Sequence, residues 1–502
     1  MGNEKPVTTG TPPSESLTSQ SARGFFWMLG QTAGSKIFGF ATQIVLARLL
    51  APRDFGLVAL AYAAVAFVGV IRNTGIQQIL VQRHKHYRRW ANPAFWFELA
   101  VGLATAVMLA VAAPIAAATF HSGTLAGLIL VIAAAAPLSP WYVVPSAKLT
   151  RDMRFRAIAV VNIGYNLVVM AVSILLAWRG FGAYSFVIPL PVAGLLRAVW
   201  FWRLARPPIG LRPQIRRWRF LIGDSGYMLG TGFLGALVLQ SGNLALGFLC
   251  TKAAVGQFFF AFNLSTQIWQ LLSQNLGSVL LPALAKLQDD RPRQVAALLR
   301  ASRMLAFVGV PLSLLLAVVA KPVILIVYGA KWLPAVPVLQ VLAVAMAVSL
   351  PGSLAYTALQ AQGRFRAAFI FTALQLPAFL AAALVGARLG GVVGVAAGWL
   401  LVNLISSPLW IKIAGGTYAG WHGVLGVYLG PFVASAAALA PAALAICWWH
   451  ALATQYLLQG ALAAASGAVL YPLFGVAACP AELGEVTRRV KMAGGGLGRR
   501  GR

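Results

Sequence analysis

Fourteen apolar segments, each of about twenty residues or more, follow one another along this 502-residue chain with short polar loops between them. They run over 24–50, 55–81, 94–118, 124–147, 157–178, 183–202, 221–250, 254–285, 302–327, 333–361, 367–387, 391–411, 425–449 and 456–478. Helices of this length cross the ~30 Å hydrocarbon core of a bilayer with every backbone group paired. Strands of a membrane barrel would alternate in polarity, and these segments do not. The sequence therefore predicts an all-α polytopic membrane protein with about fourteen transmembrane helices.

The composition supports this class over a soluble or a nucleic-acid-binding protein. Hydrophobic residues make up 60% of the chain and charged residues only 10%, whereas soluble domains carry about 25% charged residues. The formal net charge is +30, but the basic residues lie in short clusters between apolar segments rather than on a basic face or in a basic domain. We therefore expect contact with membrane lipid and none with nucleic acid.

The basic residues also predict how the helices are oriented. If the N-terminus is cytoplasmic, 30 of the 40 Lys and Arg residues fall on the cytoplasmic side. Those on the outer side are Arg53, Arg179, Lys252, Lys321, Lys331 and Arg388. Because basic residues are retained on the cytoplasmic side of membranes, this distribution predicts that both termini are cytoplasmic.

The polar segments give no sign of catalysis. The longest loop, 203–220, is short and basic, so we expect no extramembrane catalytic domain and no polysaccharide polymerase or ligase activity. Cys250, Cys447 and Cys479 are isolated and offer no metal-ligand spacing. The Gly-rich phosphate loop of ATP-binding proteins does not occur. We therefore expect no enzyme, no metal and no cofactor.

An internal repeat aligns the first two apolar segments with the seventh and eighth at a shift of 200 residues. The matches are Met28-Leu29-Gly30 with Met228-Leu229-Gly230, Leu46 with Leu246, Leu49 with Leu249, Gly56 with Gly256, and Ala61 with Ala261. Both copies start on the cytoplasmic side, which predicts two six-helix lobes related by an axis along the membrane normal. The predicted parts are a tail (1–23), an N-terminal lobe (24–202), a basic linker (203–220), a C-terminal lobe (221–412), two extra helices (425–478) and a second tail (479–502).

Five stretches, in order along the chain, resemble one family. The run Ala47-Arg48-Leu49-Leu50-Ala51-Pro52-Arg53-Asp54-Phe55-Gly56 resembles the opening signature of Wzx-type polysaccharide flippases. The others are Gln82-Arg83, Leu149–Arg156, Leu281–Asp290 and Tyr328–Pro334. The chain is most similar to the colanic-acid or exopolysaccharide branch over about residues 24–415.

This resemblance implies a flippase of the multidrug/oligosaccharidyl-lipid/polysaccharide exporter superfamily. Such proteins move undecaprenyl-diphosphate-linked oligosaccharide repeat units across the bacterial inner membrane for exopolysaccharide or lipopolysaccharide biosynthesis. A polysaccharide polymerase and export machinery are the implied partners. The alternative is a multidrug or cation antiporter of the same superfamily, which should carry a buried carboxylate for ion coupling. Glu98 and Asp224 alone come near the apolar segments, both close to cytoplasmic ends, so the coupling ion stays open.

A diphosphate inside the membrane needs cations, which cost at least ~2.5–3.5 kcal/mol there unless they face a wet cavity or a partner. Lys36 is one candidate, because Ser35–Thr42 resembles the cavity-lining segment of lipid II flippases, although Thr42 stands where those proteins have a second Arg. Arg72 is another, since a guanidinium binds phosphate bidentately. Gln43, seven residues from Lys36, shares its face. The alternatives are a Lys36 that snorkels to the interface and an Arg72 bonded to helix-end carbonyls.

Four amides form a further candidate site in the segment 254–285. Their spacing of 4, 3 and 4 residues places them on one helical face; they are Asn263, Gln267, Gln270 and Gln274. Two interpretations stay open, namely hydrogen bonding to sugar hydroxyls and hydrogen bonding between helices. Arg48 and Arg197 lie nearer the ends of their segments, which favours interfacial anchoring.

Overall fold

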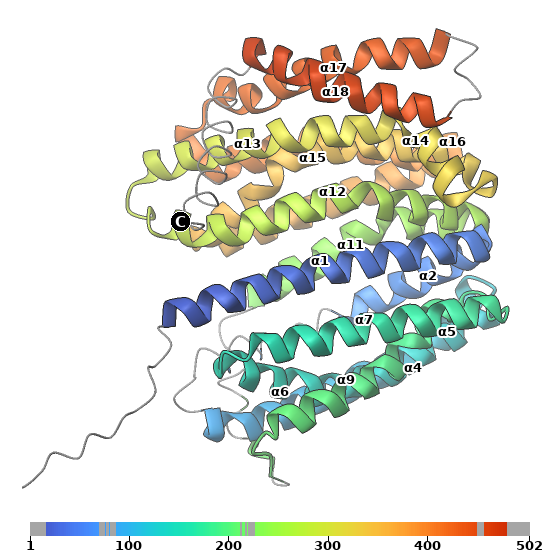
Figure 1. The fold of residues 1–502 in the computed structure, drawn as a ribbon, viewed down its shortest axis with the longest axis vertical. Helices are drawn as coiled ribbons and strands as arrows, with labels where there is room; N and C mark the ends of the chain where they lie inside the picture. Colours follow the sequence, from blue (N-terminus) through green and yellow to red (C-terminus); the bar gives the residue numbers. More distant parts are fainter. Residues whose placement is uncertain are drawn as a thin grey trace, which may run out of the picture. The chain divides into compact units, whose positions relative to one another are not determined.

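The computed structural model describes residues 17–69, 76, 80, 87–210, 213–215, 218, 226–448 and 456–478. Over these ranges the chain forms long helices joined by short turns (Figure 1). They are α1 (Leu17–Leu49), α2 (Pro52–Gly69), α4 (Tyr87–Thr119), α5 (Gly123–Ala135), α6 (Ser139–Arg151), α7 (Phe155–Trp178), α8 (Tyr184–Val187), α9 (Pro189–Ala205), α11 (Gly226–Leu249), α12 (Lys252–Ala285), α13 (Arg291–Val318), α14 (Ala320–Val323), α15 (Val336–Ala361), α16 (Phe365–Gly415), α17 (Trp421–Trp448) and α18 (Tyr456–Ala478).

The described helices confirm the predicted class, an all-α polytopic membrane protein. Nine helical segments among the described residues are long and apolar enough to cross a membrane, and the number fourteen stays a prediction. The predicted segments 367–387 and 391–411 both lie within α16, which is broken at Gly390 and Gly391. Gly391 has a φ of +56°, a conformation that glycine adopts without strain. The two halves of α16 form a hairpin so tight that a Cβ on Gly394 would lie 2.0 Å from the carbonyl oxygen of Gly386.

The chain divides into two compact units. The first contains the described residues of 1–46, 71–110 and 130–223, and the second those of 47–70, 111–129 and 224–502. In the first unit α9 packs against α6 and α7, and in the second α15 packs against α12, α13 and α16. Helices α17 and α18 lie side by side in the second unit (Figure 1). The division into two six-helix lobes, with the boundaries stated above, remains a prediction.

The repeat-related glycines Gly56 and Gly256 meet in the second unit. A Cβ on Gly56 would lie 1.8 Å from the carbonyl oxygen of Lys252, and a Cβ on Gly256 would lie 1.8 Å from that of Pro52. Pro52 and Lys252 are themselves 200 residues apart, so each contact is the copy of the other under the shift found in the sequence. The first turns of α2 and α12 therefore cross backbone to backbone, at a separation that only glycine permits.

Other repeat-related residues have matching burial. Leu46 and Leu246 are buried, as are Ala61 and Ala261, whereas Leu49 and Leu249 are 45% and 41% exposed. The match follows from the same local two-fold arrangement, because symmetric packing exposes the same face of each copy.

Two of the stretches that resemble the flippase family bind one another in the second unit. Lys331 Nζ donates to the carbonyl oxygens of Arg48 (2.8 Å) and Leu50 (2.6 Å), and Trp332 Nε1 donates to that of Ala47 (2.9 Å). In return, Arg48 Nε donates to the carbonyl oxygen of Val327 (2.8 Å). The last carbonyls of a helix have no partner within it, so these side chains satisfy the end of α1. The signature therefore builds a joint between helix ends.

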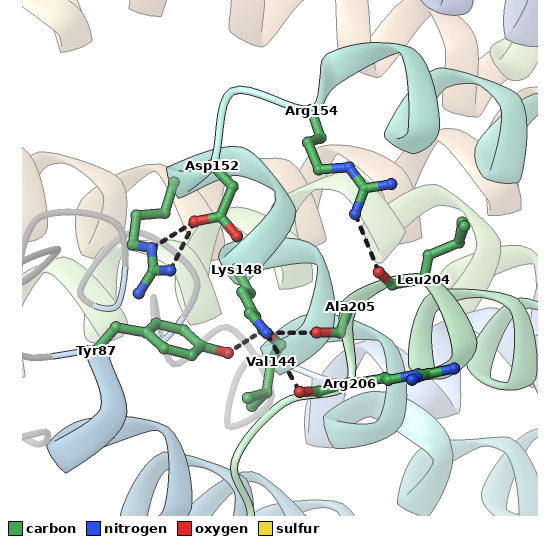
Figure 2. A network of polar contacts seen from close by, with 9 residues as sticks. Tyr87, Val144, Lys148, Asp152, Arg154, Leu204, Ala205 and Arg206 are labelled. Atoms are coloured by element: carbon green, nitrogen blue, oxygen red, sulfur yellow. Dashed lines mark hydrogen bonds and ion pairs between the residues drawn. The ribbon is translucent and has the colours of Figure 1, made fainter. Parts of the chain in front are cut away.

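A third such stretch, Leu149–Arg156, joins α6 to α7 in the first unit, and its Arg154, together with the preceding Lys148, contacts the C-terminal end of α9. Figure 2 shows the polar contacts there, which are Lys148 Nζ to the carbonyl oxygens of Ala205 (2.5 Å) and Arg206 (3.2 Å), and Arg154 Nη1 to that of Leu204 (3.2 Å). Arg206 ends the helix in the left-handed conformation, with a φ of +43°. Cations beside terminal carbonyls stabilise a helix C-terminus, so this stretch also has a structural role.

Tyr87, at the start of α4, ties the same region together (Figure 2). Its hydroxyl donates to the carbonyl oxygen of Val144 at 3.0 Å, and the guanidinium of Arg151 lies 4.8 Å from its ring centroid. Arg151 also forms an ion pair with Asp152 (2.6 Å). Burial raises the pKa of Tyr87 well above its usual value, which keeps the phenol protonated and able to donate.

Candidate functional site

A cavity of about 480 Å³ lies within the second unit, between α11, α12, α15 and α16. Its polar lining residues are Thr231, Asn263, Thr266, Gln270, Ser349, Ser353, Tyr356, Thr372, Gln375, Asn403, Ser406 and Ser407. Its larger apolar and aromatic lining residues are Val238, Leu239, Phe262, Trp269, Met346, Phe379, Trp399 and Trp410. None of the lining residues is Asp, Glu, Lys, Arg or His, so the described wall of this cavity is polar but uncharged.

Three indoles line the cavity, and two of them, Trp399 and Trp410, are packed against other rings. Trp399 packs edge-on against Phe262 (ring centroids 4.9 Å apart) and at a tilt against Phe379 (4.7 Å). Trp410 packs edge-on against Phe371 (4.6 Å). Rings held by other rings lose little freedom when a ligand stacks on them, so they suit a ligand with a flat apolar face.

The polar groups of the cavity wall are positioned by hydrogen bonds within the protein, and some of their donors and acceptors remain available to a ligand. Trp410 Nε1 donates to Gln375 Oε1 (3.2 Å), and Asn403 Nδ2 donates to the carbonyl oxygen of Trp399 (2.8 Å). The buried indole N–H of Trp399 has no partner among the described residues. A buried donor without a partner costs about 1–3 kcal/mol, and an acceptor atom on a ligand would recover part of this.

Of the four amides predicted to share one face of α12, two line the cavity and two do not. Asn263 and Gln270 line the cavity, whereas Gln267 and Gln274 are not among its lining residues. Gln274 is exposed. Asn263 Nδ2 donates to the carbonyl oxygen of Phe259 (2.8 Å), which leaves its Oδ1 as an acceptor. Two of the four amides therefore line this cavity, and the role of the four as a substrate site stays a prediction.

The predicted diphosphate residues belong elsewhere in the chain. Lys36 lies in α1 within the first unit and its side chain is exposed, and Gln43 in the same helix is half-buried. Ser35, beside Lys36, accepts a hydrogen bond from Asn166 Nδ2 (2.9 Å). Arg72 lies outside the described residues. The diphosphate role of these three side chains therefore stays a prediction.

The two arginines predicted as interfacial anchors have different surroundings. Arg48 binds helix-end carbonyls, as described above. Arg197 lies among rings of the first unit, with its guanidinium 4.4 Å from the ring centroid of Tyr142, 5.0 Å from that of Tyr165 and 5.6 Å from that of Phe201. A cation over several ring faces gains electrostatic stabilisation, so Arg197 holds α6, α7 and α9 together.

The residues of α16 were missed from the sequence, although a signal was present. Asn403, Ser407 and Trp410 recur at spacings of 4 and 3 residues, the same periodicity that singled out the amides of α12. Gln375 comes from the other half of the hairpin and is isolated in its segment. Only folding at Gly390 and Gly391 brings it to Trp410.

Comparison with known proteins agrees with the fold and with the resemblance. A family model described as "Polysaccharide biosynthesis protein" matches residues 45–337. The succinoglycan biosynthesis transport protein ExoT of Rhizobium meliloti (strain 1021) is 26% identical over 384 residues, which cover 76% of this chain and 78% of that protein. The lipopolysaccharide biosynthesis protein WzxC of Escherichia coli (strain K12) is 23% identical over 403 residues, with 78% and 80% covered.

Two solved structures share the fold at low sequence identity. The lipid II flippase MurJ, in an inward closed conformation, matches with a TM-score of 0.67 and 14% identity, covering 90% of this chain and 98% of that one. An inward-facing multidrug resistance MATE family transporter matches with a TM-score of 0.60 and 14% identity, covering 76% and 95%. The fold is therefore one shared by flippases and multidrug transporters.

Proposed function

Since the chain belongs to the polysaccharide biosynthesis protein family, we propose that it is a flippase for lipid-linked oligosaccharide repeat units. The substrate is an undecaprenyl-diphosphate-linked repeat unit destined for exopolysaccharide or lipopolysaccharide. The protein moves it across the bacterial inner membrane, with both termini cytoplasmic, by alternating access of two six-helix lobes. The names and roles of the relatives support this proposal, and a polysaccharide polymerase and export machinery are the partners it entails.

The observation that carries the proposal is the uncharged cavity of the second unit. A sugar ring presents hydroxyls that both donate and accept around its edge, and C–H groups on its faces. Amides and hydroxyls match the edge because each can donate and accept, and indoles match the face because their ring surface is electron-rich. Gln375 and Trp410, already joined by a hydrogen bond, offer both kinds of contact at one place.

The absence of charged lining residues among those described restricts the sugars that fit. A uronic acid or another acidic substituent would bring a carboxylate into a site of low dielectric with no cation to pair it, which costs several kcal/mol. A neutral saccharide pays no such cost. We therefore assign to this cavity an uncharged sugar of the repeat unit.

The diphosphate requires a different, cationic part of the protein. Lys36 is the cation of α1 that we assign to this role, and Gln43 lies two turns further along the same helix. Arg72 is the third residue assigned to this role, from its sequence position alone. Separate neutral and cationic sites suit a substrate whose sugar and diphosphate differ in charge.

The same cavity weighs against a multidrug antiporter. Cationic drugs need a carboxylate to offset their desolvation, and the described lining of the cavity holds none. The buried Glu98 lies in the first unit, where it accepts a hydrogen bond from Ser139 Oγ (3.2 Å). We therefore place the antiporter second.

A deletion strain of the source bacterium tests the function directly. We expect undecaprenyl-diphosphate oligosaccharide to accumulate on the cytoplasmic side, and wild-type protein to clear it. Lys36→Ala should leave most of the pool in place, because it removes the cation of α1 that we assign to the diphosphate, whereas Lys36→Arg should clear it. The measurement is extraction and quantification of the lipid-linked pool, with expression checked by immunoblot.

The control for this experiment is Arg179→Ala, which removes an exposed cation at the end of α7. Its pool should match that of the wild type. An unchanged pool in the deletion strain, together with altered tolerance to cationic drugs, would overturn the flippase and favour the antiporter.

A further inference from the structure

A second cavity, of about 520 Å³, lies in the second unit among the ends of α2, α4, α11 and α12. Arg53, His121 and Lys252 line it, and no acidic residue does so among the described residues. In the topology predicted from the loops this end of the helices faces outward, where basic residues are scarce. Two of the six outer Lys and Arg residues nevertheless gather here with a histidine.

Arg53 is a polar residue of the Ala47–Gly56 signature that takes no part in the contacts between the end of α1 and the segment before α15. Arg48 binds carbonyls of the segment before α15, and Asp54 Oδ2 accepts from the backbone N–H of Ala51 (3.0 Å). Arg53 makes no hydrogen bond or ion pair with the described residues, and its guanidinium is exposed at the cavity. The carboxylate of Asp54, beside it in sequence, accepts a hydrogen bond within the turn and is not among the lining residues of the cavity.

The other two polar residues, Lys252 and His121, are joined through the backbone beside the cavity. Lys252 Nζ donates to the carbonyl oxygen of His121 (3.1 Å), which leaves two of its three N–H groups for another acceptor. His121 adopts a positive φ of +49°, which is strained for a residue with a side chain. The hydrogen bond from Lys252 to the backbone of His121 stabilises this strained turn, and both residues line the cavity.

The cavity has an apolar side as well. Phe120 and Phe248 pack with ring centroids 5.1 Å apart, both line the cavity, and Phe248 is 60% exposed. In a chain that crosses a membrane, such a ring contacts acyl or prenyl chains. An occupant of this site therefore needs an anionic group and an attached hydrocarbon chain, so free phosphate would satisfy only half of it.

We propose that this cavity binds the phosphate group of a lipid in the outer leaflet. Arg53 and Lys252 would take the phosphate oxygens by charge-assisted hydrogen bonds, with the imidazole N–H of His121 as a further donor, while the chain lies along Phe248. Two lipids have this chemistry, an anionic phospholipid and the prenyl diphosphate of a transported substrate. The site is separate in residues from the neutral sugar cavity, and its existence does not depend on the transport proposal.

Titration calorimetry on the full-length protein in detergent tests the site with three probes: dihexanoyl phosphatidylglycerol, farnesyl diphosphate and inorganic pyrophosphate. We expect at least one of the two lipids to bind. The double variant Arg53→Gln/Lys252→Gln should raise the Kd of that lipid by about tenfold or more. Lys321→Gln, which removes another outer cation away from the cavity, should change the Kd less than about twofold. Pyrophosphate should bind more weakly than farnesyl diphosphate.

The relative Kd values of the two lipids show which of them occupies the site. Tighter binding of farnesyl diphosphate identifies the transported lipid as the occupant, and tighter binding of phosphatidylglycerol identifies bulk lipid. Equal Kd values for wild type and the double variant, or no binding of either lipid by the wild type, would overturn the proposal. If the glutamine variant elutes as aggregate, the single variant Arg53→Gln decides, because the exposed Arg53 side chain supports no other described residue.

Discussion

Replacing Gly256 by alanine is expected to destabilise the protein by about 3 kcal/mol, at the upper end of the usual cost of overpacking. A methyl group there would lie 1.8 Å from the carbonyl oxygen of Pro52, so the first turns of α2 and α12 would have to move apart. Gly56→Ala should cost about as much, because its contact with Lys252 is the repeat-related copy. The apparent Tm in detergent, followed by the monodisperse fraction after heating, measures both losses.

The double variant Gly56→Ala/Gly256→Ala tests whether the two glycines contact the same helix crossing. Once one methyl group has separated the two backbones, the second finds space, so the two losses should add to clearly less than their sum. Gly460→Ala in α18, where no atom lies within 4 Å of the new Cβ, is the matched control and should be neutral or stabilising by about 0.5–1 kcal/mol. Additive losses, or a stable Gly256→Ala protein, would mean that α2 and α12 do not cross in this way.

Removing the indole of the half-buried Trp410 is expected to lower transport of a neutral lipid-linked oligosaccharide by up to about tenfold, since an aromatic contact contributes up to ~1.5 kcal/mol to binding. Trp410→Phe should retain more activity, because it keeps a ring and loses only the N–H that Gln375 accepts. Gln375→Glu should be as severe as Trp410→Ala, because it places a carboxylate in an uncharged wall. Proteoliposomes with a fluorescent lipid-linked oligosaccharide give the rates.

Trp178→Ala is the control for these variants, since Trp178 is 75% exposed and lies outside the cavity. Its transport rate should equal that of the wild type. Wild-type rates for both Trp410→Ala and Gln375→Glu would show that the sugar is held elsewhere, while the lipid-linked pool in the deletion strain would still decide whether the protein is a flippase. Failure of the site and failure of the function are therefore distinguishable.

The sequence alone determined the class of the protein and the register of its repeat. Whether a segment can span a bilayer depends on its own length and hydrophobicity. The membrane-spanning helices can therefore be predicted from the sequence without knowing which helices pack beside them. The shift of 200 residues was also readable, because symmetric packing at Gly56 and Gly256 demands small residues at both positions. Three of the stretches that resemble the flippase family carry side chains that bond to helix-end carbonyls, namely Arg48, Lys331 with Trp332, and Arg154.

Only the tertiary structure decided which polar residues work together. The cavity takes Thr231, Asn263, Ser353 and Trp410 from two pairs of helices, α11 with α12 and α15 with α16, which α13 and α14 separate in the chain. Helical periodicity shows that amides share a face, but not whether that face meets a cavity, a neighbouring helix or lipid. An amide such as Asn263 can donate to a carbonyl of its own helix in any of these surroundings. The presence of Asn263 in the sequence therefore does not indicate which of the three surroundings it has. The surroundings arise when the helices pack, and that packing separated Asn263 and Gln270 from the exposed Gln274.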